Sequence, residues 1–192
     1  MTSRRDELLS AVIAAAADGG LARRSLRDLA AQVGTSHRML IHHFGSRDGL
    51  LAAVVEAMER EQIERIRAQP ADPVEAVRDT WRRTSDPAFW PVERLFFECY
   101  ARGAQGEPPF DRLVPKLVDD TLRAITDRGV DPDSDRAVLG RLALAVIRGL
   151  LLDLVATGDR DATDRAAEMF ASMISATVER SSSAGRAERI RT

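Results

Sequence analysis

Apolar residues recur at helical spacing along almost the whole chain, and this feature constrains the fold most strongly. No segment alternates apolar and polar residues in the manner of a half-buried strand, and Gly, Pro and Asp signals separate the periodic stretches. The sequence therefore predicts an all-α protein. After a set of shorter helices that ends near residue 45, the expected helices cover residues 47–68, 74–84, 88–104, 110–128, 134–157 and 160–180.

Composition narrows the class of protein. The chain is 44% hydrophobic and 30% charged, which is typical of a globular protein. Arg141, Arg148 and Asp153 interrupt the most apolar region, so we expect no membrane span and no membrane partner. The basic start is followed at once by acidic residues, which is atypical of a signal peptide. The single cysteine, Cys99, excludes an internal disulfide, and a cytoplasmic location is expected.

Residues 26–45 have the spacing of a helix-turn-helix. Ser25 precedes an apolar helical set, and Asp28 stands where it can form part of a capping box. Ala30 is small enough to let a second helix cross closely, and Gly34 can adopt the positive φ of a tight turn. Leu40 would fill the space between the two helices. Spacing alone leaves an ordinary helical hairpin as the alternative.

The stretch from Ser25 to Leu50, SLRDLAAQVGTSHRMLIHHFGSRDGL, resembles the N-terminal DNA-binding domain of the tetracycline-repressor (TetR) family of bacterial regulators. The resemblance is specific over residues 6–55, and beyond them only length and helical architecture agree. One departure is Ile41, where relatives most often carry a Tyr that touches a phosphate. The residues expected to contact DNA are Ser25, Thr35, Ser36, His37, Arg38, Ile41, His42, His43 and Arg47.

The residues expected to contact DNA fall into those that read base edges and those that hold phosphates. Arg is well shaped for bidentate contact with guanine, so Arg38 in the first turn of the second helix is expected to read a base edge. Ser36 can cap that helix and bring its amides to a phosphate. By resemblance, Ser25 and Arg47 contact phosphates and fix the register on the duplex. A solvated surface arginine remains the alternative for each basic residue.

The resemblance implies a homodimeric, one-component transcriptional regulator that occupies a palindromic operator and is released by a small ligand, and the aromatic residues described below predict that this ligand is largely apolar. Repression is expected, and activation stays open. The head would comprise residues 1–48, the ligand-binding and dimerisation body 49–180, and a disordered tail 181–192. A helical protein-interaction module or an enzymatic bundle without sequence-specific DNA binding is the alternative.

Two wide apolar faces in the segments 134–157 and 160–180 predict the dimer interface, because a monomer would leave them exposed. The alternative is that other helices of the body bury both faces. The expected interface residues are Val138, Leu142, Val146, Gly149, Met169, Phe170, Met173 and Ile174.

Most of the aromatic side chains fall in a short window that ends at Tyr100, and aromatic walls with a few polar groups are typical of small-molecule sites. A packed core is the alternative, since several of these residues are at helical spacing. The expected ligand-binding residues are Trp81, Phe89, Trp90, Arg94, Phe97, Glu98, Tyr100, Leu113, Leu117 and Thr121.

Metal binding and catalysis find little support. His37, His42 and His43 do not have the i, i+4 spacing that places two imidazoles on one helix face, and no cysteine or paired carboxylate lies nearby. No nucleophile elbow, phosphate loop or HExxH motif occurs. We expect no metal, no cofactor and no enzymatic activity.

Overall fold

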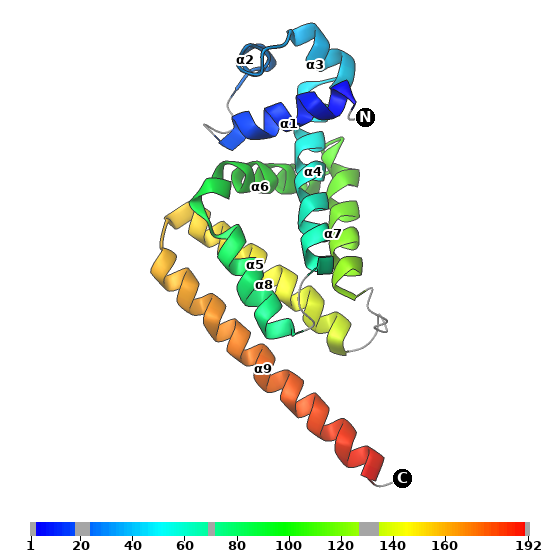
Figure 1. The fold of residues 1–192 in the computed structure, drawn as a ribbon, viewed down its shortest axis with the longest axis vertical. Helices are drawn as coiled ribbons and strands as arrows, with labels where there is room; N and C mark the ends of the chain where they lie inside the picture. The colour runs from blue at the N-terminus through cyan, green and yellow to red at the C-terminus, as the bar shows by residue number, and fades with distance from the viewer. Residues whose placement is uncertain (1–2, 18–23, 69–71, 127–134, 191–192) are drawn as a thin grey trace.

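The computed structural model describes residues 3–17, 24–68, 72–126 and 135–190, and for 16–17, 135–136 and 178–190 it describes the backbone alone. Regular structure within these ranges is helical, which confirms the predicted all-α class. A head of three short helices stands at one end of a body of longer helices (Figure 1). The elements are α1 (Arg4–Ala17), α2 (Leu26–Gln32), α3 (His37–Phe44), α4 (Arg47–Ala68), α5 (Pro73–Thr84), η1 (Pro87–Phe89), α6 (Trp90–Ala104), α7 (Phe110–Thr126), α8 (Asp135–Thr157) and α9 (Arg160–Ile190).

The head forms because short-range signals agree with long-range packing. The Ser25 hydroxyl accepts a hydrogen bond from the Asp28 N–H at 3.2 Å, and the Asp28 carboxylate accepts the Ser25 N–H at 3.2 Å. This reciprocal pair is a capping box that starts α2. Gly34 has a φ of 67°, which a side chain would strain, and it turns the chain into α3. Ala30 and Leu40 are buried where the two helices cross, so the predicted helix-turn-helix is confirmed.

One apolar core runs from the head into the body without interruption. Leu40 of α3 and Leu95 of α6 belong to the same buried cluster, and α6 packs against both α1 and α4. Gly49 lets α4 approach the end of α3, because a Cβ there would lie 2.1 Å from the Phe44 carbonyl oxygen. The expected domain boundary after residue 48 therefore falls inside α4 and within shared packing, with no linker between the two parts.

A second apolar core holds α5, α8 and α9 together. Trp81, Leu154 and Phe170 are buried at its centre. Along its other side α9 continues to Ile190, well beyond the packed part of the body (Figure 1). The structure continues α9 through 181–190, where the sequence predicts a disordered tail, and 191–192 lie outside the described residues.

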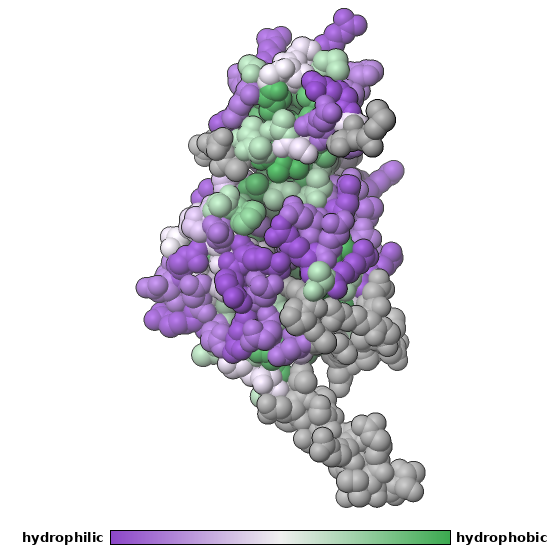
Figure 2. Space-filling model, in the orientation of Figure 1, coloured by the Kyte–Doolittle hydropathy of each residue, from purple (hydrophilic) through white to green (hydrophobic). Residues whose placement is uncertain are grey.

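The visible face of the body is mostly hydrophilic, whereas hydrophobic residues gather where the head meets the body, at the level of α1 and α6 (Figures 1 and 2). Among the described helices, none is both long enough and apolar enough to span a membrane.

Candidate functional site

The end of α3 that follows the turn is open to solvent. Ser36 caps the helix, and its hydroxyl accepts the Met39 N–H at 3.2 Å. His37 and Arg38 follow in the first turn, and both are exposed. Leu40 anchors the opposite side of the helix in the core, where it is 1% exposed. Burial of Leu40 and Phe44 orients α3 so that its polar first turn faces outward.

The other residues expected at the DNA lie around this turn. Ile41 and His42 are exposed on α3, and Ile41 is 36% exposed despite its apolar side chain. Thr35 and His43 are half-buried, and the Nε2 atom of His43 is buried without a hydrogen-bond partner among the described residues. Ser25 is exposed, although its side chain is engaged in the α2 cap. Ser25 thus lies just before α2, Thr35 lies in the turn, and Ile41, His42 and His43 lie along α3.

Arg47 lies at the start of α4 and is half-buried. Its Nε–H donates to the Arg24 carbonyl oxygen at 3.3 Å, so part of the guanidinium ties α4 to the segment before α2. The next residue, Asp48, accepts two hydrogen bonds from Arg102 of α6, at 2.9 and 2.8 Å. These bonds hold the pKa of Asp48 below its usual value. The start of α4 is therefore connected both to the head and to the body.

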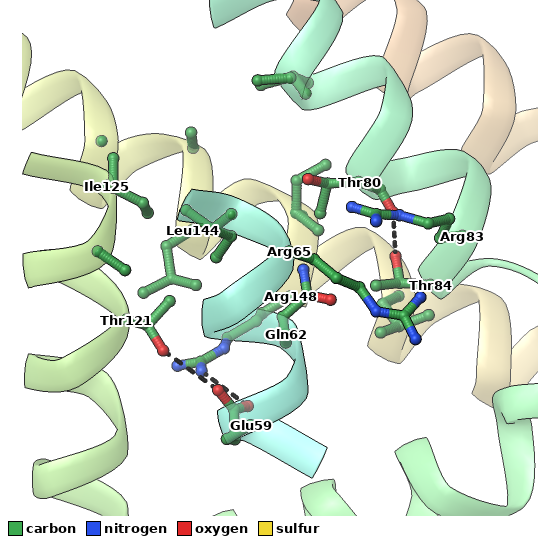
Figure 3. Close-up of a pocket in the computed structure, with 18 of the residues that line it drawn as sticks. Glu59, Gln62, Arg65, Thr80, Arg83, Thr84, Thr121, Ile125, Leu144 and Arg148 are labelled. Atoms are coloured by element: carbon green, nitrogen blue, oxygen red, sulfur yellow. Dashed lines mark hydrogen bonds and ion pairs between the residues drawn. The ribbon is translucent and has the colours of Figure 1, made fainter. Parts of the chain in front are cut away.

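A cavity of about 270 Å³ opens in the body, between α4, α5, α6, α7 and α8. Its walls are mainly aliphatic, with Met58, Val92, Leu144 and Ile147 among the lining side chains. Figure 3 shows its polar residues in two groups, one around Glu59 and Thr121 and one on the α5 side around Thr80, Arg83 and Thr84. A mostly apolar cavity with a few convergent polar groups is the usual form of a small-molecule site.

The first polar group is a buried network. Arg148 of α8 pairs with Glu59 of α4 at 3.3 Å, and the Thr121 hydroxyl donates to the same carboxylate at 3.1 Å. The Arg148 guanidinium also lies over the ring of Phe96, 4.9 Å from its centroid. Burial raises the pKa of Glu59 above its usual value, and Arg148 opposes that effect. This network closes the inner end of the cavity.

Comparison with known proteins identifies the head. Residues 8–54 match the family described as bacterial regulatory proteins, tetR family. An HTH-type transcriptional repressor from Mycobacterium tuberculosis is 32% identical over 103 residues, which cover 50% of this chain and 55% of that protein. The match thus spans about half the length of this curated relative.

Solved structures extend the likeness to the whole fold. A TetR-family transcriptional regulator from Pectobacterium atrosepticum is 25% identical, with a TM-score of 0.61 over 92% of this chain and 95% of that one. The head in sequence, and the whole chain in fold, are similar to regulators of the TetR family. The transcriptional regulator FadR from Bacillus subtilis, solved in complex with stearoyl-CoA, shares the fold at 12% identity, with a TM-score of 0.56 and coverage of 86% and 97%.

The cavity overlaps the predicted ligand-binding residues only in part, although Phe89, Val92 and Phe96 of the aromatic window line it. Of the expected ligand-binding residues, Phe89 and Thr121 line it, and the others do not. Trp81 is buried in the second core, with its indole N–H donating to Asp164 at 2.7 Å. The remaining residues pack against a core, make other contacts or lie toward the surface: Trp90, Arg94, Phe97, Glu98, Tyr100, Leu113 and Leu117.

Trp81 packs in the second core because a large aromatic side chain gains much from burial and its indole N–H finds an acceptor there. The polar residues of the cavity were missed because each one reads as a solvated position on its own helix. Arg148 offered the clearest signal, since it interrupts the most apolar stretch of the sequence. Glu59 and Glu93 carried no comparable signal.

The structure leaves some of the expected dimer-interface residues exposed and buries others. Val138, Leu142 and Gly149 of α8 are exposed, as are Met169 and Met173 of α9. The expectation needs correction for the rest: Phe170 and Ile174 are buried in the second core, and Val146 packs partly against it. The apolar side chains of α9 cover two faces, and residues at 170 and 174 turn toward α5 and α8.

No group of metal-ligating side chains occurs within the described residues. Burial raises the pKa of the Cys99 thiol to about 12, so the side chain stays protonated near neutral pH and packs as a small apolar group.

Proposed function

We propose that this protein is a transcriptional regulator that binds a palindromic operator as a homodimer and represses the adjacent promoter. The observation that carries the proposal is the exposed first turn of α3, with Ser36, His37 and Arg38 facing solvent after the Gly34 turn. Such a turn can enter the major groove and reach base edges. Arg47, Ser25 and the helix N-terminus would then hold the phosphates on either side.

Dimerisation is supported by the exposed apolar stripe on α8 and α9. Met169 is 68% exposed and Val138 is 64% exposed, which is costly for a soluble monomer. Pairing two such stripes about a two-fold axis would bury them and place two copies of α3 about one DNA turn or somewhat more apart. We therefore assign the interface to Val138, Leu142, Gly149, Met169 and Met173, with residues 1–48 as the reader and 49–180 as the regulatory body.

A small-molecule effector would bind in the cavity between α4 and α8. The cavity borders α4 and α6, which are the two helices that contact the head, so its occupancy can influence the position of α3. The complex of FadR with stearoyl-CoA supports this use of the fold. A ligand releases the operator if it binds more tightly to the conformation that has the lower affinity for DNA. Each 1.4 kcal/mol of this preference lowers the operator affinity about tenfold.

The test is a selection of bound sequences from randomised duplexes by the full-length protein, followed by binding titrations of the selected site. We expect a two-fold symmetric site with strong salt dependence. A transcription assay on a promoter that carries this site distinguishes repression from activation. Recovery of no enriched sequence would contradict the proposal and favour a protein-interaction module.

A further inference from the structure

Charged side chains line the cavity, and all but one of them have an ion-pair partner. Arg148 pairs with Glu59 at the inner end, and Arg65 pairs with Glu61. The exception is Glu93 of α6, whose carboxylate makes no hydrogen bond or ion pair with any described residue. A charged group in a largely apolar cavity is costly unless a partner compensates it. The partner of Glu93 is thus absent from this part of the chain.

The surroundings of Glu93 are both apolar and negative. Val92 and Phe96 beside it are buried, and burial is the main cause that raises the pKa of Glu93 to about 7. The Glu59 carboxylate raises this pKa further, and Arg148 partly lowers it. Arg148 is already shared between Glu59 and the Phe96 ring. Arg148 is thus bonded to Glu59 and acts on Glu93 only through its charge, so the carboxylate of Glu93 would repel an anionic ligand.

Arg83, on the α5 side of the cavity, also has hydrogen-bond donors without acceptors (Figure 3). Its Nη2 atom lies 3.3 Å from an Asp79 oxygen, which balances the charge. Even so, Nη2 and Nε are buried and make no hydrogen bond within the described residues. Two buried N–H groups without acceptors favour a ligand that brings a neutral oxygen to them, since their charge already has a counter-ion.

We propose that the cavity binds an organic cation, a protonated amine joined to an apolar body, with the ammonium against Glu93. The aliphatic walls of α4 and α8 take the apolar body, and a carbonyl, ether or hydroxyl oxygen of the ligand accepts from Arg83. That this cation is the effector rests on the proposed function. Binding of the cation itself needs neither DNA nor a second protomer.

Three probes with the same phenyl group and carbon chain test the ligand class: 4-phenylbutylamine, 4-phenylbutanol and 4-phenylbutanoate. Their binding to the full-length protein, without DNA, is measured by calorimetry and thermal shift at about pH 8. We expect the amine to bind roughly tenfold or more tightly than the alcohol, because an ionic hydrogen bond to Glu93 is added, and the carboxylate to bind most weakly. Equal affinities, preference for the carboxylate, or no binding of the amine would overturn the proposal.

Glu93→Gln keeps the side-chain shape and removes the charge, and it should abolish the preference for amine over alcohol. Glu61→Gln is the matched control, because it changes another lining carboxylate that is already paired with Arg65. This control should keep the preference. Thermal unfolding of both variants without ligand shows that they fold. Retention of the preference in Glu93→Gln would refute the assignment of the site.

A pH titration adds a readout that mere structural damage would not reproduce. The groups that face Glu93 are Glu59 of α4 and Arg148 of α8, with Arg83 of α5 on the same cavity. Lowering the pH below about 7 protonates Glu93 in the free protein, so amine affinity should fall while alcohol affinity stays constant. Glu93→Gln should lose this dependence.

The outcomes separate this inference from the proposed function. Amine binding without any operator binding would support the cation site and contradict the regulator. Operator binding without amine binding would leave the regulator intact and overturn the cation site. When both occur, the amine should displace the operator duplex from the wild-type protein and not from Glu93→Gln.

Discussion

At the scale of single residues, Arg38 and Arg47 differ in burial, and this difference should appear in DNA binding. Arg38 is exposed on the first turn of α3, so Arg38→Ala should cost roughly 1–3 kcal/mol on the selected site and relax preference at one base pair. Arg47→Ala should weaken all sequences alike and reduce the salt slope by about one. Anisotropy titrations over a series of single-base variants and salt concentrations measure both effects. Indistinguishable sequence profiles would contradict this division.

Glu93 also predicts a pH dependence of stability. Its carboxyl binds a proton more tightly in the folded protein, with a pKa of about 7 against the ordinary 4.5. Between these values the folded state holds a proton that the unfolded chain lacks, so raising the pH through this range lowers the free energy of unfolding. Glu93→Gln should therefore be more stable than wild type at about pH 8, on the order of 2 kcal/mol, and nearly equal at about pH 5. Urea unfolding at the two pH values measures the difference, and a pH-independent difference would refute the cause.

At the scale of elements, Arg102 connects α6 to the head. Besides its two bonds to Asp48, its Nε–H donates to Glu107 at 2.7 Å, and its guanidinium lies 4.4 Å from the Phe110 ring centroid. Arg102→Gln should lower the free energy of unfolding by only roughly 1 kcal/mol, because the ion pair between Arg102 and Asp48 is partly exposed. It should also weaken the coupling between the cavity and α3, so that a ligand releases the operator less completely.

The control for this prediction is Arg78→Gln. Arg78 also pairs with two carboxylates, Glu75 and Glu168, but it joins α5 to α9 and lies away from the head. It should change stability by a similar amount and leave ligand-induced release unchanged. Comparison of operator affinity with and without ligand in the two variants decides the matter. Equal effects on release would show that Arg102 acts only through stability.

At the scale of the whole molecule, the exposed stripe of α8 and α9 predicts a dimer. Met169→Glu places a charge on the stripe without touching either core, and it should yield a folded monomer with reduced operator affinity. Gln105→Glu adds the same charge at an exposed position away from the stripe and should remain dimeric. Light scattering at micromolar concentration measures the mass of each.

Phe170→Glu, by contrast, should unfold the protomer, because Phe170 is buried in the second core. A monomeric wild type would contradict the interface.

The sequence alone determined features that depend on neighbours along the chain. Helix periodicity, the Ser25 capping box and the positive φ of Gly34 were all predictable, because each depends on a few adjacent residues. The burial of Leu40 followed from the same short motif. Gly49 was not recognised, since the carbonyl that excludes a side chain there belongs to the end of the preceding helix.

Tertiary structure alone decided which apolar face packs inside the protomer and where the cavity lies. Periodicity shows that a helix has an apolar side, but α9 has two, and only the positions of α5 and α8 select Phe170 for the core and leave Met169 exposed. Trp81 and Phe96 of the aromatic window are likewise buried because their side chains meet those of helices distant in sequence. Glu59, Glu93 and Arg148 come from three helices far apart in sequence, so their shared burial, and the pKa of Glu93 that results, exist only once the helices have packed.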